Sequence, residues 1–135
     1  MVLEFQDGMQ LNIIGIYGGP QTIDGVERDV FRIVIPQNVM SKADLTTLFK
    51  DNPEKTNRLY TYGEVPDELG FPKETKILSG QGYNIFISIQ EEQDVRRGIP
   101  GRLFKEVITD VYAIYMAQMT YDEYVQAFPD DPIEE

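Results

Sequence analysis

Short segments in which apolar and polar residues alternate fill most of the chain, and Gly, Pro, Asn and Asp separate these segments. This pattern is typical of β-strands joined by tight turns. The clearest alternation places Tyr83, Ile85, Ile87 and Ile89 on one side of a strand, with largely polar residues between them. We expect these four side chains to form a core face, because strand residues two positions apart point the same way.

Two Asp-Gly pairs predict hairpins near the N-terminus. Asp7-Gly8 separates β-like residues 2–5 from residues 11–17, and we expect Gly18-Gly19-Pro20 to end the second strand. Asp24-Gly25 leads into the β-rich run 28–35.

The run 28–35 becomes apolar on both faces toward its end, which is typical of a central strand, and Pro36 should stop it. A further strand is expected over 58–62, followed by a Pro- and Gly-rich loop over 63–72. The charged stretch 91–101 ends in Gly98-Ile99-Pro100-Gly101 and is predicted to be an exposed loop.

Two short helices are expected. Ser41 and Asp44 form a variant of the capping box, and apolar residues at helical spacing follow over 45–49. They predict a helix of about ten residues with one apolar stripe that packs on a sheet. A second capping box over 120–123 opens a short helix that runs through Ala127.

The segment 103–117 can be interpreted in two ways. Its apolar spacing fits one face of a helix, whereas its β-branched residues favour a strand. We predict a strand and keep the helix as the alternative.

The order of elements predicts the fold class. Strands come first, then a helix, then more strands, with links of hairpin length, so antiparallel pairing is expected. We predict an α+β, predominantly β fold: a small antiparallel sandwich or open barrel with one packed helix and a short C-terminal helix. Residues 1–128 should form a single globular domain, and 129–135 a disordered acidic tail.

Composition removes several kinds of chemistry. The 135 residues include no histidine and no cysteine, so histidine acid–base catalysis, thiol chemistry and Cys/His zinc sites are excluded. Residues 15–19 are glycine-rich but lack the Lys-Ser/Thr and the helix of a phosphate-binding loop. Neighbouring acids lack the ligand spacing of a calcium loop and are interpreted as solvated surface. We predict no catalytic residue, no cofactor and no metal site.

The chain is strongly acidic. Twelve basic residues against 23 acidic ones give a net charge of −11, which repels phosphate backbones and anionic membranes. We therefore expect no direct nucleic-acid or membrane partner. The N-terminus lacks a signal-peptide pattern, and no apolar run approaches the roughly 20 residues that span a bilayer. The charge also keeps a protein soluble.

Two groups of residues are candidates for protein contacts. A basic island flanks a Gly-Pro-Gly loop, and guanidinium groups pair well with carboxylates. A tyrosine cluster follows, and tyrosine suits both core edges and interfaces. The candidate interaction residues are Arg96, Arg97, Arg102, Tyr112, Tyr115, Tyr121 and Tyr124. The alternatives are a solvated loop for the arginines and core packing for the tyrosines.

Two segments carry a resemblance to a family: Gly18-Gly19-x-x-Thr22-Ile23-x-Gly25-Val26-x-Arg28-Asp29-Val30 and Tyr115-Met116-Ala117-Gln118-Met119-Thr120-Tyr121-Asp122-Glu123. They resemble small uncharacterised proteins encoded in the tail and baseplate gene regions of siphophages and prophages of Gram-positive bacteria. The helix over 45–49 also matches, whereas 64–82 and 96–102 fit poorly and Met119 replaces a basic residue. The resemblance implies no activity and assigns no functional residue.

The resemblance implies a non-enzymatic phage or prophage virion component, a tail or baseplate structural or assembly protein. It would contact itself or other tail proteins, in the host cytoplasm during assembly and in the virion if structural. Two alternatives stay open. The acidic charge fits an inhibitor or nucleic-acid mimic that binds a host protein, and paired carboxylates fit a carboxylate-based or metal-assisted hydrolase.

Overall fold

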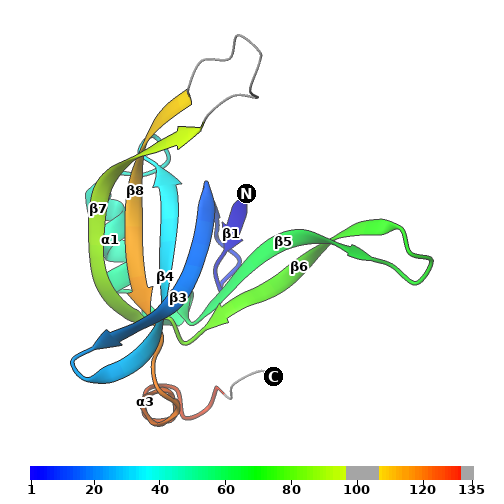
Figure 1. The fold of residues 1–135 in the computed structure, drawn as a ribbon. Helices are drawn as coiled ribbons and strands as arrows, with labels where there is room; N and C mark the ends of the chain where they lie inside the picture. The colour runs from blue at the N-terminus through cyan, green and yellow to red at the C-terminus, as the bar shows by residue number, and fades with distance from the viewer. Residues whose placement is uncertain (97–106, 132–135) are drawn as a thin grey trace.

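The structure, a computed structural model, describes residues 1–96 and 107–131 and consists of two four-stranded antiparallel sheets with short helices (Figure 1). Sheet A contains, in spatial order, β2 (Gln10–Asn12), β1 (Val2–Glu4), β5 (Arg58–Pro66) and β6 (Pro72–Gln81). Sheet B contains β3 (Gly15–Ile23), β4 (Val26–Pro36), β8 (Val107–Ala117) and β7 (Ile85–Arg96). The helices are α1 (Lys42–Lys50), α2 (Pro53–Thr56) and α3 (Tyr121–Ala127). The predicted α+β, predominantly β class is confirmed.

Both Asp-Gly hairpins form as predicted. The first turn carries Gly8 at φ +91°, and β1 pairs with β2 on either side of it. The second turn joins β3 to β4, with Asp24 and Gly25 at φ +50° and +79°. A two-residue turn with positive φ at both central residues has a backbone twist that matches the twist of the flanking strands.

The predicted strand 11–17 is divided between the two sheets. The amide of Ile13 donates to the Met1 carbonyl in sheet A, whereas the next amide, that of Ile14, donates to Val34 in sheet B. The expected break at Gly18-Gly19-Pro20 is wrong, since β3 runs through it to Ile23. β3 is an edge strand of sheet B, where a proline costs no ladder hydrogen bond if its nitrogen faces outward.

One apolar core joins both sheets and α1. The predicted stripe on α1 is buried (Leu45, Leu48, Phe49), and the Ser41 hydroxyl caps the helix by accepting from the Asp44 amide at 3.2 Å. The rings of Phe5 and Phe49 meet edge to face, with centroids 5.6 Å apart. Side chains from β4 and β8 complete the cluster, so α1 lies on the face of sheet B that carries Ile33 and Ile114.

The alternation predicted for β7 is wrong at Ile85 and Ile87. Ile85 pairs with Ala117, one position away from the core residue Met116, and so lies on the other face of the sheet. The pairing with β8 shifts between Phe86 and Ser88, which leaves Ile87 without an opposite partner and 40% exposed. Phe86 and Ile89 pack against the core instead. A bulge adds one residue to one strand, so alternation restarts in the other phase beyond it.

Two predicted loops are partly strand. β7 continues to Arg96, so the loop expected over 91–101 is wrong for 91–96, and the rest lies outside the described residues. The loop expected over 63–72 is confirmed only for 67–71, since β5 and β6 pair as far as Pro66 and Pro72. The strand chosen for 103–117 is confirmed over 107–117.

Candidate functional site: a projecting hairpin and its base

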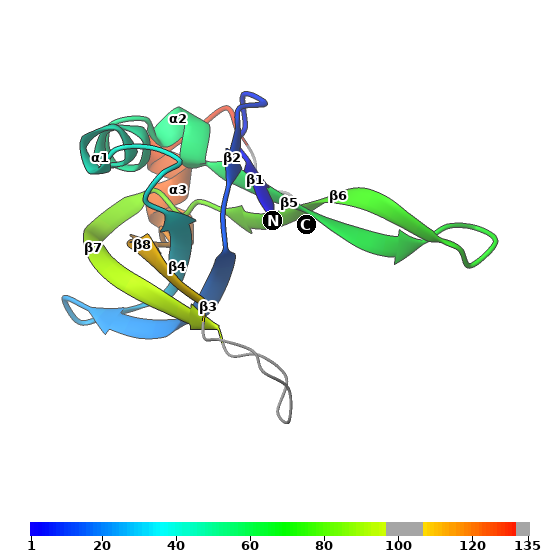
Figure 2. The ribbon, with the colours of Figure 1, turned by 90° about the horizontal axis from the view of Figure 1, so that it is seen from above.

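The hairpin formed by β5 and β6 extends away from the rest of the molecule in both views (Figures 1 and 2). β1 pairs with β5 only at Thr61 and Tyr60. From the pair Tyr62–Lys76 outward, the two strands pair only with each other among the described residues. We call residues 62–76 the arm. A two-stranded ribbon without further packing is marginally stable in water, so its conformation must be held by local features.

The tip of the arm, residues 67–71, is fixed by its own hydrogen bonds. The Asp67 amide donates to the Phe71 carbonyl at 2.8 Å, and one Asp67 carboxylate oxygen accepts from the amides of Leu69 and Phe71, both at 2.9 Å. Gly70 adopts φ +84°, a conformation that favours glycine. Proline rings on the facing strands lock φ on both sides of the turn. The tip is therefore pre-organised.

This rigid tip presents apolar side chains to solvent. Leu69 is 82% exposed and Phe71 65% exposed, and Val65 and Ile77 add exposed apolar surface along the arm. The polar groups of the turn are used internally, since the Asp67 carboxylate holds the backbone. Clustered exposed apolar side chains mark contact surfaces, and anchors that are already ordered lose little entropy on binding.

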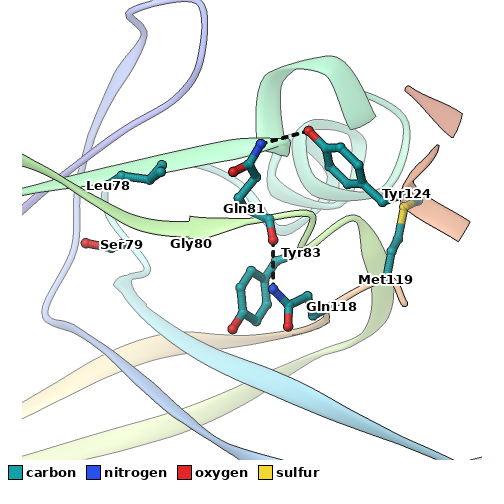
Figure 3. Close-up of a pocket in the computed structure, with 8 residues that line it drawn as sticks. All are labelled: Leu78, Ser79, Gly80, Gln81, Tyr83, Gln118, Met119 and Tyr124. Atoms are coloured by element: carbon teal, nitrogen blue, oxygen red, sulfur yellow. Dashed lines mark hydrogen bonds between the residues drawn. The ribbon is translucent and has the colours of Figure 1, made fainter. Parts of the chain in front are cut away.

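At the base of the arm, beyond residues 62–76, the inner end of β6 meets α3 around a pocket of about 280 Å³ (Figure 3). Its lining residues are Leu78, Ser79, Gly80, Gln81, Tyr83, Gln118, Met119 and Tyr124. The Gln81 side-chain amide donates to the Tyr124 hydroxyl at 2.8 Å, and the Gln118 side-chain amide donates to the Gln81 carbonyl at 2.9 Å.

Tyr83 links the pocket to sheet B. Its hydroxyl donates to Asp29 at 2.7 Å, and burial raises its pKa, so it stays protonated. Its ring stacks on Phe31 with centroids 3.7 Å apart. The pocket thus lies where β6, α3 and, through Tyr83, sheet B meet. Its lining contains no pairing of a nucleophile with a base.

Two ion pairs hold the C-terminal segment in place. Arg58 donates through both terminal nitrogens to Asp131, at 2.5 and 3.1 Å, and Asn57 donates to the same carboxylate at 2.7 Å. Arg28 forms a second two-pronged pair with Glu123, at 2.5 and 3.0 Å. This guanidinium, together with the Thr120 amide, lowers the pKa of Glu123 to about 2. Asp131 belongs to the segment 129–135 assigned to the tail, and residues 132–135 lie outside the described part of the chain.

Glu4 connects the strands of sheet A. Its carboxylate accepts from Gln10 at 3.0 Å and from the Tyr62 hydroxyl at 2.7 Å, and it pairs with Lys76. These hydrogen bonds, that of Gln10 first, lower the pKa of Glu4 to about 2. Because Tyr62 and Lys76 begin the arm, Glu4 fixes the point at which the arm leaves the body.

The predicted interaction residues do not form one site among the described residues. Arg96 is exposed and pairs with Asp94 on its own strand at 2.9 Å, while Arg97 and Arg102 lie outside the described residues.

The four tyrosines are dispersed. Tyr112 and Tyr115 lie on opposite faces of β8, since Tyr112 packs against the core and Tyr115 does not. Tyr124 is buried at the base of the arm, and Tyr121 is exposed at the start of α3.

Sequence reasoning missed Leu69 and Phe71, because the prolines and glycines around them were interpreted as a loop. The available signal was local: Asp67 and Gly70 can close a tight turn, and two large apolar residues flank that glycine.

The two segments that carry the family resemblance lie side by side. Val30 pairs with Ala117 across β4 and β8, and the Gln118 amide donates to the Asp29 carbonyl at 2.8 Å. With the Arg28–Glu123 pair, these contacts place α3 against the second hairpin of sheet B. The residues of these two segments therefore have a structural role in this chain.

Comparison with known proteins finds no matching family, curated protein or solved structure. In the part of the chain that the structure describes, no three acidic side chains gather in a way that could hold a metal ion. None of the described helices is long and apolar enough to cross a membrane.

Proposed function

We propose that this chain is a non-enzymatic component of a phage or prophage virion, a tail or baseplate structural or assembly protein, and that the arm is its contact element. One observation carries the proposal: a two-stranded ribbon projects from the body, and the hydrogen-bonded turn at its tip exposes the side chains of Leu69 and Phe71. A tip with no role in the protein's own core is best explained by a contact with another protein.

The chemistry of the other regions supports a contact role over catalysis. The pocket at the base of the arm is lined by amide, hydroxyl and apolar groups, several of them bonded to each other. The carboxylates of Glu4, Glu123 and Asp131 bind the protein's own cations. These three acids lie on different elements and are paired within the chain, so they do not form a row of free carboxylates of the kind that a nucleic-acid mimic needs.

The test is to follow the chain through particle assembly. In the host and genome that encode it, the natural chain is replaced by the Leu69→Ser/Phe71→Ser variant, with Thr47→Ser on the exposed side of α1 as control. We expect the natural and control chains in purified particles or in a complex with a tail protein, and loss of both for the arm variant. Normal particles in the absence of the chain, or incorporation that ignores the arm, would refute the proposal.

A further inference from the structure

Gly19 is a glycine that the protein's own fold does not require. It lies inside β3, its φ is not positive, and a Cβ built on it would meet no atom within 4 Å. Gly18 and Gly15 differ, because a Cβ at Gly18 would lie 3.2 Å from the Phe31 ring and one at Gly15 would collide with Tyr17. A glycine weakens a strand interior and often marks the close approach of another molecule.

Gly19 forms part of a groove on the face of sheet B that points away from α1. Cross-strand pairing puts Tyr17, Arg32 and Tyr115 in one row and Gly19 beside Val30 in the next row on the same face. Together they line a groove of about 280 Å³, and the Arg32 guanidinium lies 5.9 Å from the centre of the Tyr17 ring. Tyrosine and arginine are the side chains that most often dominate the affinity of protein contacts.

The arm tip has the matching chemistry. Leu69 and Phe71 are apolar anchors that suit the phenol rings, Val30 and the open space above Gly19. Glu68, exposed beside them, is complementary in charge to the Arg32 guanidinium, which is partly accessible although it pairs with Glu92 at 3.3 Å. The arm extends away from sheet B in both views, so a chain cannot fill its own groove (Figures 1 and 2).

We propose that the groove lined by Tyr17, Gly19, Val30, Arg32 and Tyr115 receives the arm tip of a second copy of this chain. The inference rests on the proposed function, in which the arm is the contact element, and it names the partner. Such a contact joins two different surfaces, so each added copy offers a new arm and a new groove, and the product is a ring or a filament. At physiological ionic strength charges further apart than about 8 Å are screened, so the local pairing of Glu68 with Arg32 outweighs the net charge of −11.

The test uses sedimentation velocity of the purified full chain over a concentration series at physiological ionic strength. The arm variant is Leu69→Ser/Phe71→Ser. The groove variant is Gly19→Tyr, which fills the groove, and Thr22→Tyr is its control because it adds the same side chain to the same strand outside the groove lining. We expect oligomers for the natural chain and the control, and association at least about 30-fold weaker for either variant, as for the loss of a contact hot spot.

A mixture of the arm and groove variants gives the decisive measurement. The groove variant has the natural arm but a filled groove, and the arm variant has the natural groove but an altered arm. Only one contact is therefore possible in the mixture, which should form one-to-one dimers and nothing larger. Thermal unfolding of each variant checks its folding, and Gly19→Tyr should not melt earlier, since its Cβ meets no atom.

A natural chain that stays monomeric at every concentration, or a mixture that does not dimerise, would overturn the inference. If that monomer still binds a tail protein through Leu69 and Phe71, the proposed function survives and only the second copy is wrong. If arm-dependent binding is absent as well, both are wrong.

Discussion

The two ends of one hairpin differ in what holds them. At the base of the arm, Arg58, Tyr124 and Asp131 connect elements far apart in sequence, and the side chains of Arg58 and Tyr124 are buried. At the tip, a five-residue turn satisfies its backbone locally and leaves Leu69 and Phe71 in solvent. The two ends should therefore respond differently to mutation. Changes at the base should lower the stability of the protein, whereas changes at the tip should alter only its binding.

The largest effect is expected from Arg58→Ala at the base. Arg58 is almost buried, and its loss removes both guanidinium donors from the Asp131 carboxylate, which keeps the hydrogen bond from the Asn57 amide. Breaking one side of a buried ion pair should lower the free energy of unfolding by about 3 kcal/mol, measured by urea denaturation. Asp131→Asn is the companion variant. If the double variant is more stable than the sum of the two single effects predicts, the two residues are coupled, whereas strict additivity would count against the contact.

The second-largest loss of stability is expected from Gly80→Ala. A Cβ at Gly80 would lie 2.4 Å from the Phe31 ring and 2.9 Å from the Tyr83 ring, which are stacked on each other. Overpacking of this kind costs about 2 kcal/mol and should appear as a lower melting temperature. Gly19→Ala is the matched control and should be neutral or slightly stabilising, since its Cβ meets nothing. Equal effects at the two glycines would contradict the packing described at the base.

Stability should fall in acid through Glu4 and Glu123. The pKa of each is about 2 in the folded protein against an ordinary value of 4.5, so the unfolded chain binds more protons between these values. Their contribution is complete above pH 4.5 and is lost as the pH falls toward 2. Glu4→Gln should lower stability at neutral pH and flatten the loss below pH 4.5, measured by thermal melts across this range. An unchanged pH profile would mean that Glu4 does not hold the root of the arm.

The smallest effect on stability is expected at the tip. Leu69→Ser/Phe71→Ser removes side chains that are mostly in solvent, and such surface changes usually stay within about 0.5 kcal/mol. The melting temperature should therefore match that of the natural chain while binding is lost. A large drop in melting temperature would show that these side chains pack within the protein and would remove the contrast between tip and base.

The sequence predicted features that depend on neighbouring residues, and it missed features that depend on contacts between distant segments. Asp24-Gly25 and the cap at Ser41 are set by neighbouring residues, and both were predicted correctly. The bulge at Ile87 was not, because it arises from the pairing of β7 with β8 and leaves no mark in the alternation itself.

The candidate site was less accessible to sequence reasoning. The arm was interpreted as a loop because Pro66 and Pro72 usually interrupt strands, whereas here each occupies the end of a two-stranded ribbon. Arg58 and Asp131 are 73 positions apart in the sequence, so no local sequence pattern predicts their contact.

The facing prolines have a consequence for crowded assemblies. A proline has no backbone N–H. The outer ends of neighbouring arms therefore cannot form a shared β-ladder through Pro66 and Pro72. Arms that lie close together would therefore stay separate at these positions and could not extend one another's sheet.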